Sequence, residues 1–219
     1  MIPARIGSKR LKKKNLALLN GKPLISYAIN AAKKAKIFHK IIINSDSKKF
    51  KKFSKKYNID FYLRPKKFGK SNVKSDEVVL DFFNKFSCDI CVWVNPISPL
   101  QTGEEIKKVV KFFIKNKLNS LITVENRKVH SIYKNKPINF RLNEKFKQTQ
   151  DIIPIRQFVY SIMMWSKKSF IKSMKLRGSA ILHKKIGYFP VGKNSSLIVK
   201  TREDLNFIEQ VIKSKKRIN

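Results

Sequence analysis

Residues 2–16 read IPARIGSKRLKKKNL: a short apolar segment leads into a turn at Gly7 and Ser8, and a basic stretch follows. In an α/β protein, a loop after the first strand lies at the carboxyl edge of the sheet, where nucleotides bind. Gly7 has no Cβ, so a ligand can approach its backbone closely, and the amides around Ser8 can surround an anion. Positive charge for such an anion comes from Arg5, Lys9 and Lys14. The stretch predicts an anion-binding loop, although a surface turn in a lysine-rich protein would have a similar composition.

The composition indicates a globular protein of the cytoplasm. A length of 219 residues suits a single domain, residues 1–219, and a hydrophobic content of 42% argues against a disordered chain. No apolar run reaches the roughly 20 residues needed to span a membrane, and no signal peptide is visible. Cys88 and Cys91 form a C-x-x-C pair without a second pair, which favours buried, inert thiols in a reducing compartment over a zinc or redox site.

The formal net charge of +36 favours binding to polyanions through counterion release. The cations are mostly lysines scattered over every segment, however, and no basic-and-aromatic signature of a nucleic-acid module is present. A coding bias towards lysine gives the same balance. We therefore expect non-specific binding to nucleic acid at low salt, and no specific nucleic-acid partner.

Hydrophobic periodicity predicts alternating strands and helices up to residue 124. Continuous apolar runs predict buried strands of a parallel sheet, at 40–44, 59–63, 90–94 and 120–124. Helices are expected at 24–35, 48–57 and 77–86 and after Thr102. The second of these helices has an N-cap cluster at 44–47, and Ser75 and Asp76 are candidates for capping the third. The alternation predicts a doubly wound sheet with right-handed crossovers.

The regular pattern ends at residue 125. The polar stretch 125–155, which contains Pro137 and Pro154, is interpreted as an insertion within roughly 125–160. Beyond it we expect a strand at 158–165, a helix at 166–174, a strand at 185–191 and a helix at 205–213. Thr201 and Asp204 fit a capping box for this last helix.

Several stretches together resemble the cytidylyltransferases that activate acidic sugars, namely the acylneuraminate (CMP-sialic acid) synthetases and their relatives for pseudaminic, legionaminic and 3-deoxy-manno-octulosonic acids. The opening motif and the following Asn20-Gly21-Lys22-Pro23-Leu24-Ile25 carry most of the likeness. Asn44-Ser45-Asp46 is similar to the family's S-T-D, Leu63-Arg64-Pro65 to its L-R-P, and Asn95-Pro96-Ile97-Ser98-Pro99-Leu100-Gln101-Thr102 to its Q-P-T-S-P-L-R-T. Weaker matches follow at Gln150-Asp151-Ile152 and at 201–205.

The resemblance implies a three-layer, Rossmann-like nucleotidyltransferase fold with a mainly parallel twisted sheet and a small inserted dimerisation segment. It also implies that an acidic 2-keto sugar attacks the α-phosphate of CTP and that pyrophosphate leaves, with Mg²⁺ as cofactor. Catalytic roles fall to Arg5 and Lys14. The implied nucleotide-binding residues are Arg5, Gly7, Ser8, Lys9, Lys14, Asn15, Arg64, Ser71 and Ser75. The implied sugar-binding residues are Asn95, Ser98, Gln101, Gln150 and Trp165, and the partner is a second copy of the chain, as a homodimer.

The sequence departs from the family pattern at several positions. Asn95, Ile97 and Gln101 replace the family's Gln, Thr and Arg, and the N-G that precedes the family's I-Y is replaced by Tyr160-Ser161. The C-terminal I-D-I-D-T, whose aspartates hold magnesium in the family, reads Leu197-Ile198-Val199-Lys200-Thr201. Ile198 and Lys200 cannot ligate Mg²⁺, which requires oxygen ligands, so Asp46 is the one weak candidate for a metal ligand.

Three explanations are compatible with this loss. The Lys200 ammonium replaces a metal-bound charge, the metal is held by substrate phosphates with Asp46, or the protein is a weakened or inactive relative that binds nucleotide only. Asp204 is expected to cap a helix, and for Trp165 a place in the core competes with a place in the sugar pocket. Only Met1 precedes the opening motif, which indicates a short first strand or a start that is placed too late.

Overall fold

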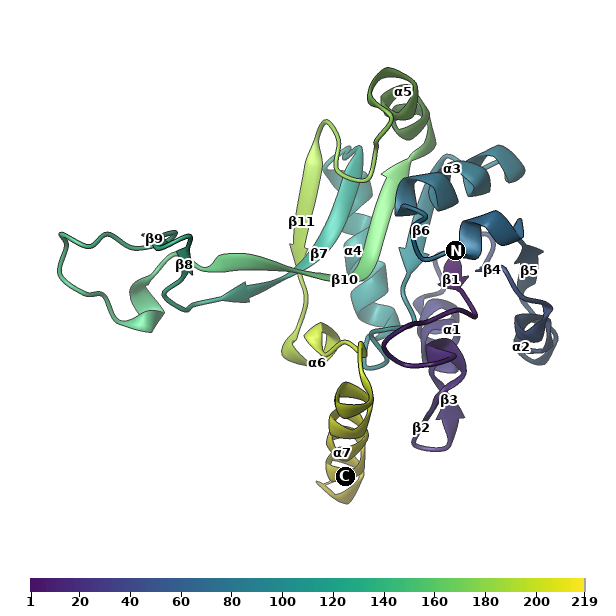
Figure 1. The fold of residues 1–219 in the computed structure, drawn as a ribbon, viewed down its shortest axis with the longest axis horizontal. Helices are drawn as coiled ribbons and strands as arrows, with labels where there is room; N and C mark the ends of the chain where they lie inside the picture. Colours follow the sequence, from purple (N-terminus) through teal and green to yellow (C-terminus); the bar gives the residue numbers. More distant parts are fainter. Residues whose placement is uncertain (219) are drawn as a thin grey trace.

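The computed structural model describes residues 1–218 and contains one central sheet flanked by helices (Figure 1). Its seven strands are β1 (Ile2–Ala4), β4 (Ile42–Ser45), β5 (Asp60–Leu63), β6 (Ile90–Val94), β7 (Ser120–Arg127), β10 (Ile155–Ser166) and β11 (Ile186–Pro190). Met1 joins the two halves of the sheet, because its amino group donates to Val92 O at 2.8 Å and Val94 N donates to Met1 O at 3.0 Å. The strand order is therefore β5-β4-β1-β6-β10-β7-β11.

Most neighbouring strands in this sheet are parallel, and β10 is the exception. The pairs β1–β4, β4–β5 and β7–β11 are parallel, whereas β10 runs antiparallel to both β6 and β7. The expected α/β fold with a mainly parallel sheet is confirmed, and the reversed strand β10 separates β6 from β7.

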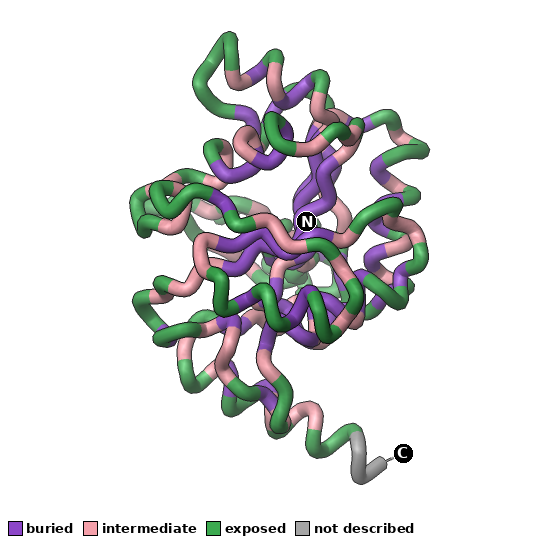
Figure 2. Tube along the Cα trace, turned by 90° about the vertical axis from the view of Figure 1, so that its right-hand side faces the viewer, coloured by how far each residue is buried: buried purple, intermediate pink, exposed green. Residues whose placement is uncertain are grey.

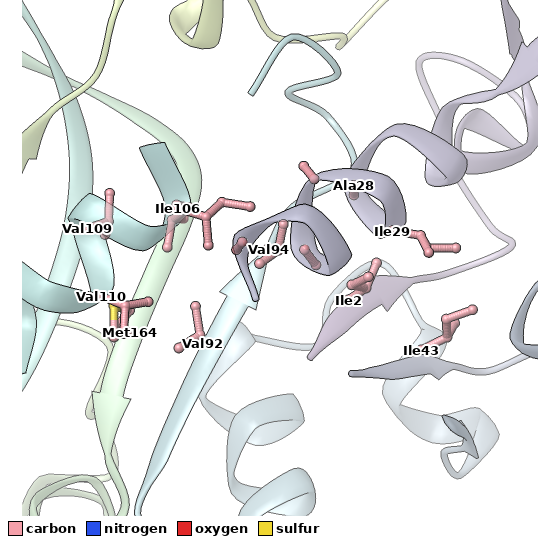
Figure 3. Close-up of a cluster of buried hydrophobic side chains, with 14 of the residues drawn as sticks. Ile2, Ala28, Ile29, Ile43, Val92, Val94, Ile106, Val109, Val110 and Met164 are labelled. Carbon is pink, nitrogen blue, oxygen red and sulfur yellow. The ribbon is translucent and has the colours of Figure 1, made fainter. Parts of the chain in front are cut away.

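Helices pack on both faces of the sheet. The first face carries α1 (Leu24–Ala35), α4 (Gly103–Lys115) and the shorter α2 (Lys51–Tyr57). Figure 3 shows Ala28 and Ile29 of α1 and Val109 of α4 in one cluster with strand side chains such as Ile43 and Val94. A Cβ at Gly103 would collide with the backbone at the end of α1, so α4 needs a glycine at its first residue to approach α1 this closely.

The second face holds the aromatic part of the core under α3 (Ser75–Lys85) and α5 (Lys167–Arg177). Trp165 is fully buried there between Trp93 and Phe170, with ring centroids 6.1 and 6.0 Å away. Cys91 is also buried in this layer, and burial raises the pKa of its thiol to about 12. The expected burial is thereby confirmed for Cys91 but not for Cys88, which is partly exposed, although burial also raises the pKa of the Cys88 thiol.

The C-terminal elements close the carboxyl edge of the sheet. After β11 come α6 (Lys193–Ser196) and α7 (Arg202–Ile218), and α7 packs on the hairpin of β2 (Leu18–Leu19) and β3 (Lys22–Pro23). Leu11, Leu19 and Leu24 form a small core with Val199, Leu205 and Ile208. The segments 11–24 and 199–208 are thus packed together beside the opening loop.

The insertion is more regular than the sequence suggested. Strands β7 and β10 extend past the sheet and pair from Phe158 opposite Val124 to Ile155 opposite Arg127. They form the root of a projecting arm, residues 125–157 (Figure 1). The short pair β8 (Ile132–Tyr133) and β9 (Lys136–Pro137) continues it. The prediction of an irregular stretch from residue 125 was wrong at these two ends, because cross-strand pairing stabilises segments whose own side chains are polar. In Figure 2 the buried segments (purple) are gathered in the middle of the molecule, and the exposed segments (green) lie mostly around them.

Two capping assignments also need correction. Lys74 is the N-cap of α3 and its N–H donates to Glu77 Oε1 at 3.0 Å, so Ser75 and Asp76 belong to the first turn instead. The Asp76 carboxylate accepts the N–H groups of Ala180 and Ile181 and so ties α3 to the segment after α5. Among residues 1–218 no helix is long and apolar enough to cross a membrane.

Candidate functional site

The predicted anion-binding loop lies at the carboxyl edge of the sheet. Residues 5–13 leave β1 there and lead into the 3-10 helix η1 (Lys14–Leu16). Asp46 follows the neighbouring strand β4, and Asn95 follows β6 on the other side. The carboxyl ends of three adjacent strands therefore frame one site, as expected for ligand binding in an open α/β sheet.

Two buried or half-buried side chains fix the backbone of this loop. Asp46 Oδ1 accepts the N–H of Ile6 at 3.0 Å, and Asn15 Nδ2 donates to the carbonyl of Arg5 at 3.3 Å. Gly69 allows Asp46 its position, because a Cβ at residue 69 would collide with the carboxylate. Asn15, which the resemblance places on the nucleotide, thus has a supporting role in this structure, while the Gly7 backbone is exposed and unobstructed.

Lys14 connects the loop to the C-terminal part of the chain. Its Nζ donates to the carbonyl of Val199 at 3.2 Å. Burial lowers the pKa of this ammonium to about 8, and the nearby charges of Arg10 and Arg5 act in the same direction. Lys200 lowers the pKa further, while Asp204 opposes the shift. Such a crowded, partly desolvated group of cations is a favourable place for a polyanion.

Arg64 lies behind the loop. It follows β5, is 4% exposed, and donates from Nη1 to the backbone and side-chain oxygens of Asn44, each at 3.4 Å. Burial lowers the pKa of the guanidinium, although the charges of Asp46 and Asp81 counteract this. Its Nε atom has no hydrogen-bond partner among the described residues, which leaves one buried donor for a ligand. Ser71 is exposed between Gly69 and α3, and Ser75 begins that helix.

Three of the predicted sugar-binding residues lie near the opening loop, and each makes a hydrogen bond within the protein. Ser98 is buried and its hydroxyl donates to Ser195 O at 2.6 Å, so it anchors α6. Gln101 is buried and donates to Ser161 Oγ at 3.3 Å, and its Oε1 has no partner in the described part of the chain. Asn95 is half-buried at the end of β6, and its Oδ1 accepts the N–H of Ile97 at 3.4 Å.

Two predicted sugar-binding residues do not join this site. Trp165 has no exposed surface, its Nε1 donates to Ile181 O at 2.9 Å, and it pairs with Cys91 and Ser120 at the amino ends of their strands. The assignment of Trp165 to the sugar pocket was wrong, because the reversed direction of β10 carries it to the opposite edge of the sheet. Gln150 is exposed in the 3-10 helix η4 (Thr149–Asp151), which belongs to the arm that projects from the sheet (Figure 1).

The described residues do not offer a carboxylate set for Mg²⁺. No group of three or more His, Cys, Asp or Glu side chains is gathered anywhere in the part of the chain that the structure describes. Asp46 stands alone and already accepts Ile6 N–H. The Asp204 carboxylate accepts Lys200 N and Thr201 N, each at 2.8 Å, and Thr201 Oγ1 accepts Asp204 N at 3.3 Å. The capping box is therefore confirmed, and the donor chemistry of this edge does not fit a protein-held magnesium ion.

Sequence reasoning missed two residues of the site. Arg10 acts on Lys14, but its position in a run of lysines gave no signal. Tyr160 has φ 60° in a bulge of β10, where the register shifts between Phe158 and Met163. A positive φ favours Gly or Asn, so the N-G of the resembling family was a usable signal for this turn.

One hollow lies beside the loop. A groove of about 550 Å³ between α1, α7 and the β2–β3 hairpin is lined by Asn20, Tyr27, Leu100 and Ile212. None of the predicted nucleotide residues lines it.

Comparisons with known proteins agree with this geometry. A CMP-N,N'-diacetyllegionaminic acid synthase of Legionella pneumophila is 33% identical over 117 residues, 51% of this chain and 50% of that protein. An N-acylneuraminate cytidylyltransferase of Escherichia coli is 32% identical over 114 residues, 52% of this chain and 27% of that protein. The chain thus spans half or less of the length of these two curated relatives. The post-translational flagellin modification protein B of Campylobacter coli is 25% identical over 232 residues and 94% of its length.

The fold has a close counterpart among solved structures. The structure of CMP:2-keto-3-deoxy-manno-octonic acid synthetase complexed with CTP covers 98% of this chain, with a TM-score of 0.76 and 14% identity, which shows a shared fold. The family model described as "Cytidylyltransferase" matches residues 1–213, nearly the whole chain. The chain belongs to the cytidylyltransferase family.

Proposed function

We propose that this protein transfers the cytidylyl group of CTP to an acidic 2-keto sugar of the sialic or nonulosonic type, giving a CMP-sugar and pyrophosphate. One observation carries the proposal beyond family membership: Arg5, Arg10 and Lys14 are gathered on a loop whose backbone is fixed by Asp46 and Asn15. A rigid cationic loop at the carboxyl edge of the sheet suits a triphosphate. The names of the relatives with 32 and 33% identity support the sugar class.

In the proposed reaction the anomeric hydroxyl oxygen of the sugar attacks the α-phosphorus of CTP, and the hydroxyl proton is released to water. The bond from that phosphorus to the bridging oxygen breaks, and pyrophosphate leaves with the electron pair. Negative charge then develops on the leaving oxygens, and the Lys14 ammonium neutralises it. Arg5, Lys9 and the exposed amides near Gly7 and Ser8 hold the phosphates in place.

Because Lys14 is partly buried, water competes weakly for its charge, and each phosphate contact gains strength. Arg64, with its free Nε donor, is proposed to contact the nucleotide from behind the loop, and Ser71 and Ser75 from the loop before α3.

The sugar is proposed to lie beyond Asn95, next to the bulge at Tyr160. The unpartnered Oε1 of Gln101 is a buried acceptor below this position. An acceptor there suits a sugar hydroxyl and disfavours direct contact with the sugar carboxylate. Selection among acidic sugars would then depend on these side chains, which are the ones that differ from the family pattern.

The experiment that tests the proposal is a panel assay. The protein is incubated with CTP and Mg²⁺ and with N-acetylneuraminate, legionaminate, pseudaminate or 3-deoxy-manno-octulosonate, while pyrophosphate release and the CMP-sugar are measured. We expect turnover with at least one sugar, and none when UTP or ATP replaces CTP. A shift of the unfolding temperature by CTP without product would indicate a relative that binds nucleotide only. Absence of both turnover and shift would sink the proposal.

A homodimer formed through the arm is proposed as the working assembly. Several large apolar side chains of the arm are exposed, and exposed apolar surface of this kind marks interaction sites: Ile132, Tyr133, Ile138, Leu142, Phe146 and Ile153. Gln150 lies among them and would approach a partner's site in such a dimer. The free thiols of Cys88 and Cys91 suit the cytoplasm, which we propose as the compartment.

Changing Leu142 or Ile153, each 77% exposed, to glutamate is expected to weaken the dimer about tenfold or more, because burying one such side chain contributes about 1.5–3 kcal/mol. Light scattering across a dilution series measures the effect. Phe207→Glu is the matched control, since this exposed residue lies on α7 outside the arm. A wild-type protein that stays monomeric at all concentrations would contradict the assembly.

A further inference from the structure

The segment 197–200 reaches the nucleotide loop by two backbone contacts. Val199 is fully buried; its N–H donates to Ile97 O at 2.8 Å, and its carbonyl accepts Lys14 Nζ at 3.2 Å. The backbone of one residue, Val199, is thus held between the loop after β6 and the opening loop. Lys200 follows it directly, so its backbone position beside Lys14 is fixed by the fold.

The backbone of Lys200 is fixed as well, while its side chain is free to move. Its N–H donates to Asp204 Oδ2 at 2.8 Å, its side chain is exposed, and no ion pair of Lys200 occurs among residues 1–215. The positive charge acts on Lys14, whose pKa it lowers together with Arg10 and Arg5. Among the described residues, Asp204 is the acid that raises the pKa of Lys14, and its carboxylate already accepts two backbone N–H groups.

We propose that Lys200 supplies, at the triphosphate of CTP, the positive charge that a carboxylate-bound divalent cation would supply, so that the protein binds CTP without holding a metal ion. This inference rests on the proposed function, because it concerns the same nucleotide loop. It follows from the residues on either side of Val199, whose backbone contacts the loop: Ile198 is apolar, Lys200 is cationic, and the Asp204 carboxylate is engaged in a helix cap.

A carboxylate that holds a metal ion and a lysine at the same position carry charges of opposite sign. A carboxylate near a triphosphate repels it unless a cation lies between them, so a carboxylate site depends on metal. An ammonium is a compact charge with three donors that contacts phosphate oxygens directly. Chelating the metal should therefore weaken CTP binding in the first arrangement and leave it unchanged in the second, where uncomplexed CTP also carries more negative charge towards Lys14 and Lys200.

Titration calorimetry with CTP tests the inference, once in Mg²⁺ and once in EDTA. For the wild-type protein we expect binding in EDTA that is no weaker than in Mg²⁺. Lys200→Ala should weaken binding in EDTA about tenfold, the loss of roughly one charge-assisted contact. Lys193→Ala, an exposed lysine of the preceding helix α6, is the matched control and should bind like the wild type.

Lys200→Asp gives the sharpest contrast, because it restores a carboxylate at this position. We expect it to lose more affinity than Lys200→Ala in EDTA and to recover part of that affinity when Mg²⁺ is added. Wild-type binding that requires Mg²⁺, or Lys200→Ala binding like the wild type, overturns the inference and leaves the proposed function in place. An absence of CTP binding under both conditions overturns both.

Discussion

Replacing Lys14 by alanine is expected to lower kcat/KM for CTP about 100- to 1000-fold, the cost of removing one preorganised charge that stabilises a developing anion. The side chain meets the requirements for such a role. Its Nζ is held by the Val199 carbonyl, it is partly buried, and three further cations act on it. Steady-state pyrophosphate release measures the effect. Lys12→Ala is the control, because Lys12 is an exposed lysine of the same loop.

The Lys14 prediction includes a pH dependence with a definite sign. The pKa of Lys14 in the free protein is lowered to about 8, first by burial and then by Arg10, Arg5 and Lys200, with Asp204 opposing. The ammonium loses its proton as the pH rises through this value, so the affinity for CTP should fall above about pH 8. Lys14→Arg should remove that fall, since a guanidinium stays charged. An affinity that is flat from pH 7 to 9 in the wild type would contradict the role of Lys14.

Folding failure is a competing cause of lost activity, and the unfolding temperature separates the two. A lysine whose pKa is lowered in the folded state destabilises the fold while it is charged, and this cost is relieved progressively as the pH rises from the lowered pKa of about 8 towards the ordinary value of 10.5. Removing Lys14 relieves that cost and loses one hydrogen bond to Val199, so we expect an unfolding temperature near that of the wild type. A large decrease would assign Lys14 a structural role.

The sequence predicted the parallel part of the fold well, for a simple physical reason. Strands buried on both faces are continuous apolar runs, and the predicted run 90–94 has the bounds of β6. Strand direction has no such signal. The apolar run at 158–165 was expected as a strand, but its reversal relative to β6 depends on the arm that precedes it. This reversal brings Ser161 to the site edge and Trp165 to the far edge.

Within the site, the sequence identified positions but not roles. Asn15 and Asp46 were expected to contact nucleotide and metal, and the structure shows both of them fixing the opening loop. Motif spacing places a side chain near a ligand without telling whether it touches the ligand or its neighbour. That distinction depends on hydrogen bonds between residues about 40 positions apart, such as Asp46 with Ile6, which local patterns do not contain.

Trp165→Ala is expected to lower the free energy of unfolding by about 3–5 kcal/mol, the usual cost of truncating a large buried aromatic side chain. The ring packs edge-on against Trp93 and Phe170 and leaves no surface to solvent. The substitution also removes the Nε1–H donor, so the Ile181 carbonyl loses that hydrogen-bond partner. Denaturant unfolding measures the change. Tyr160→Ala serves as the control from the same strand, because Tyr160 is 43% exposed and should lose far less stability.

Trp165→Phe separates the core role from a role in sugar binding. The smaller ring keeps most of the packing, so we expect a folded protein with a modest loss of stability and an unchanged KM for the sugar. A residue that contacted the sugar would give the opposite result, with KM raised and stability preserved. Because Trp165 lies at the amino ends of β6 and β7, the length of the sheet separates it from Asn95. A substitution there should reach the sugar only by unfolding the protein.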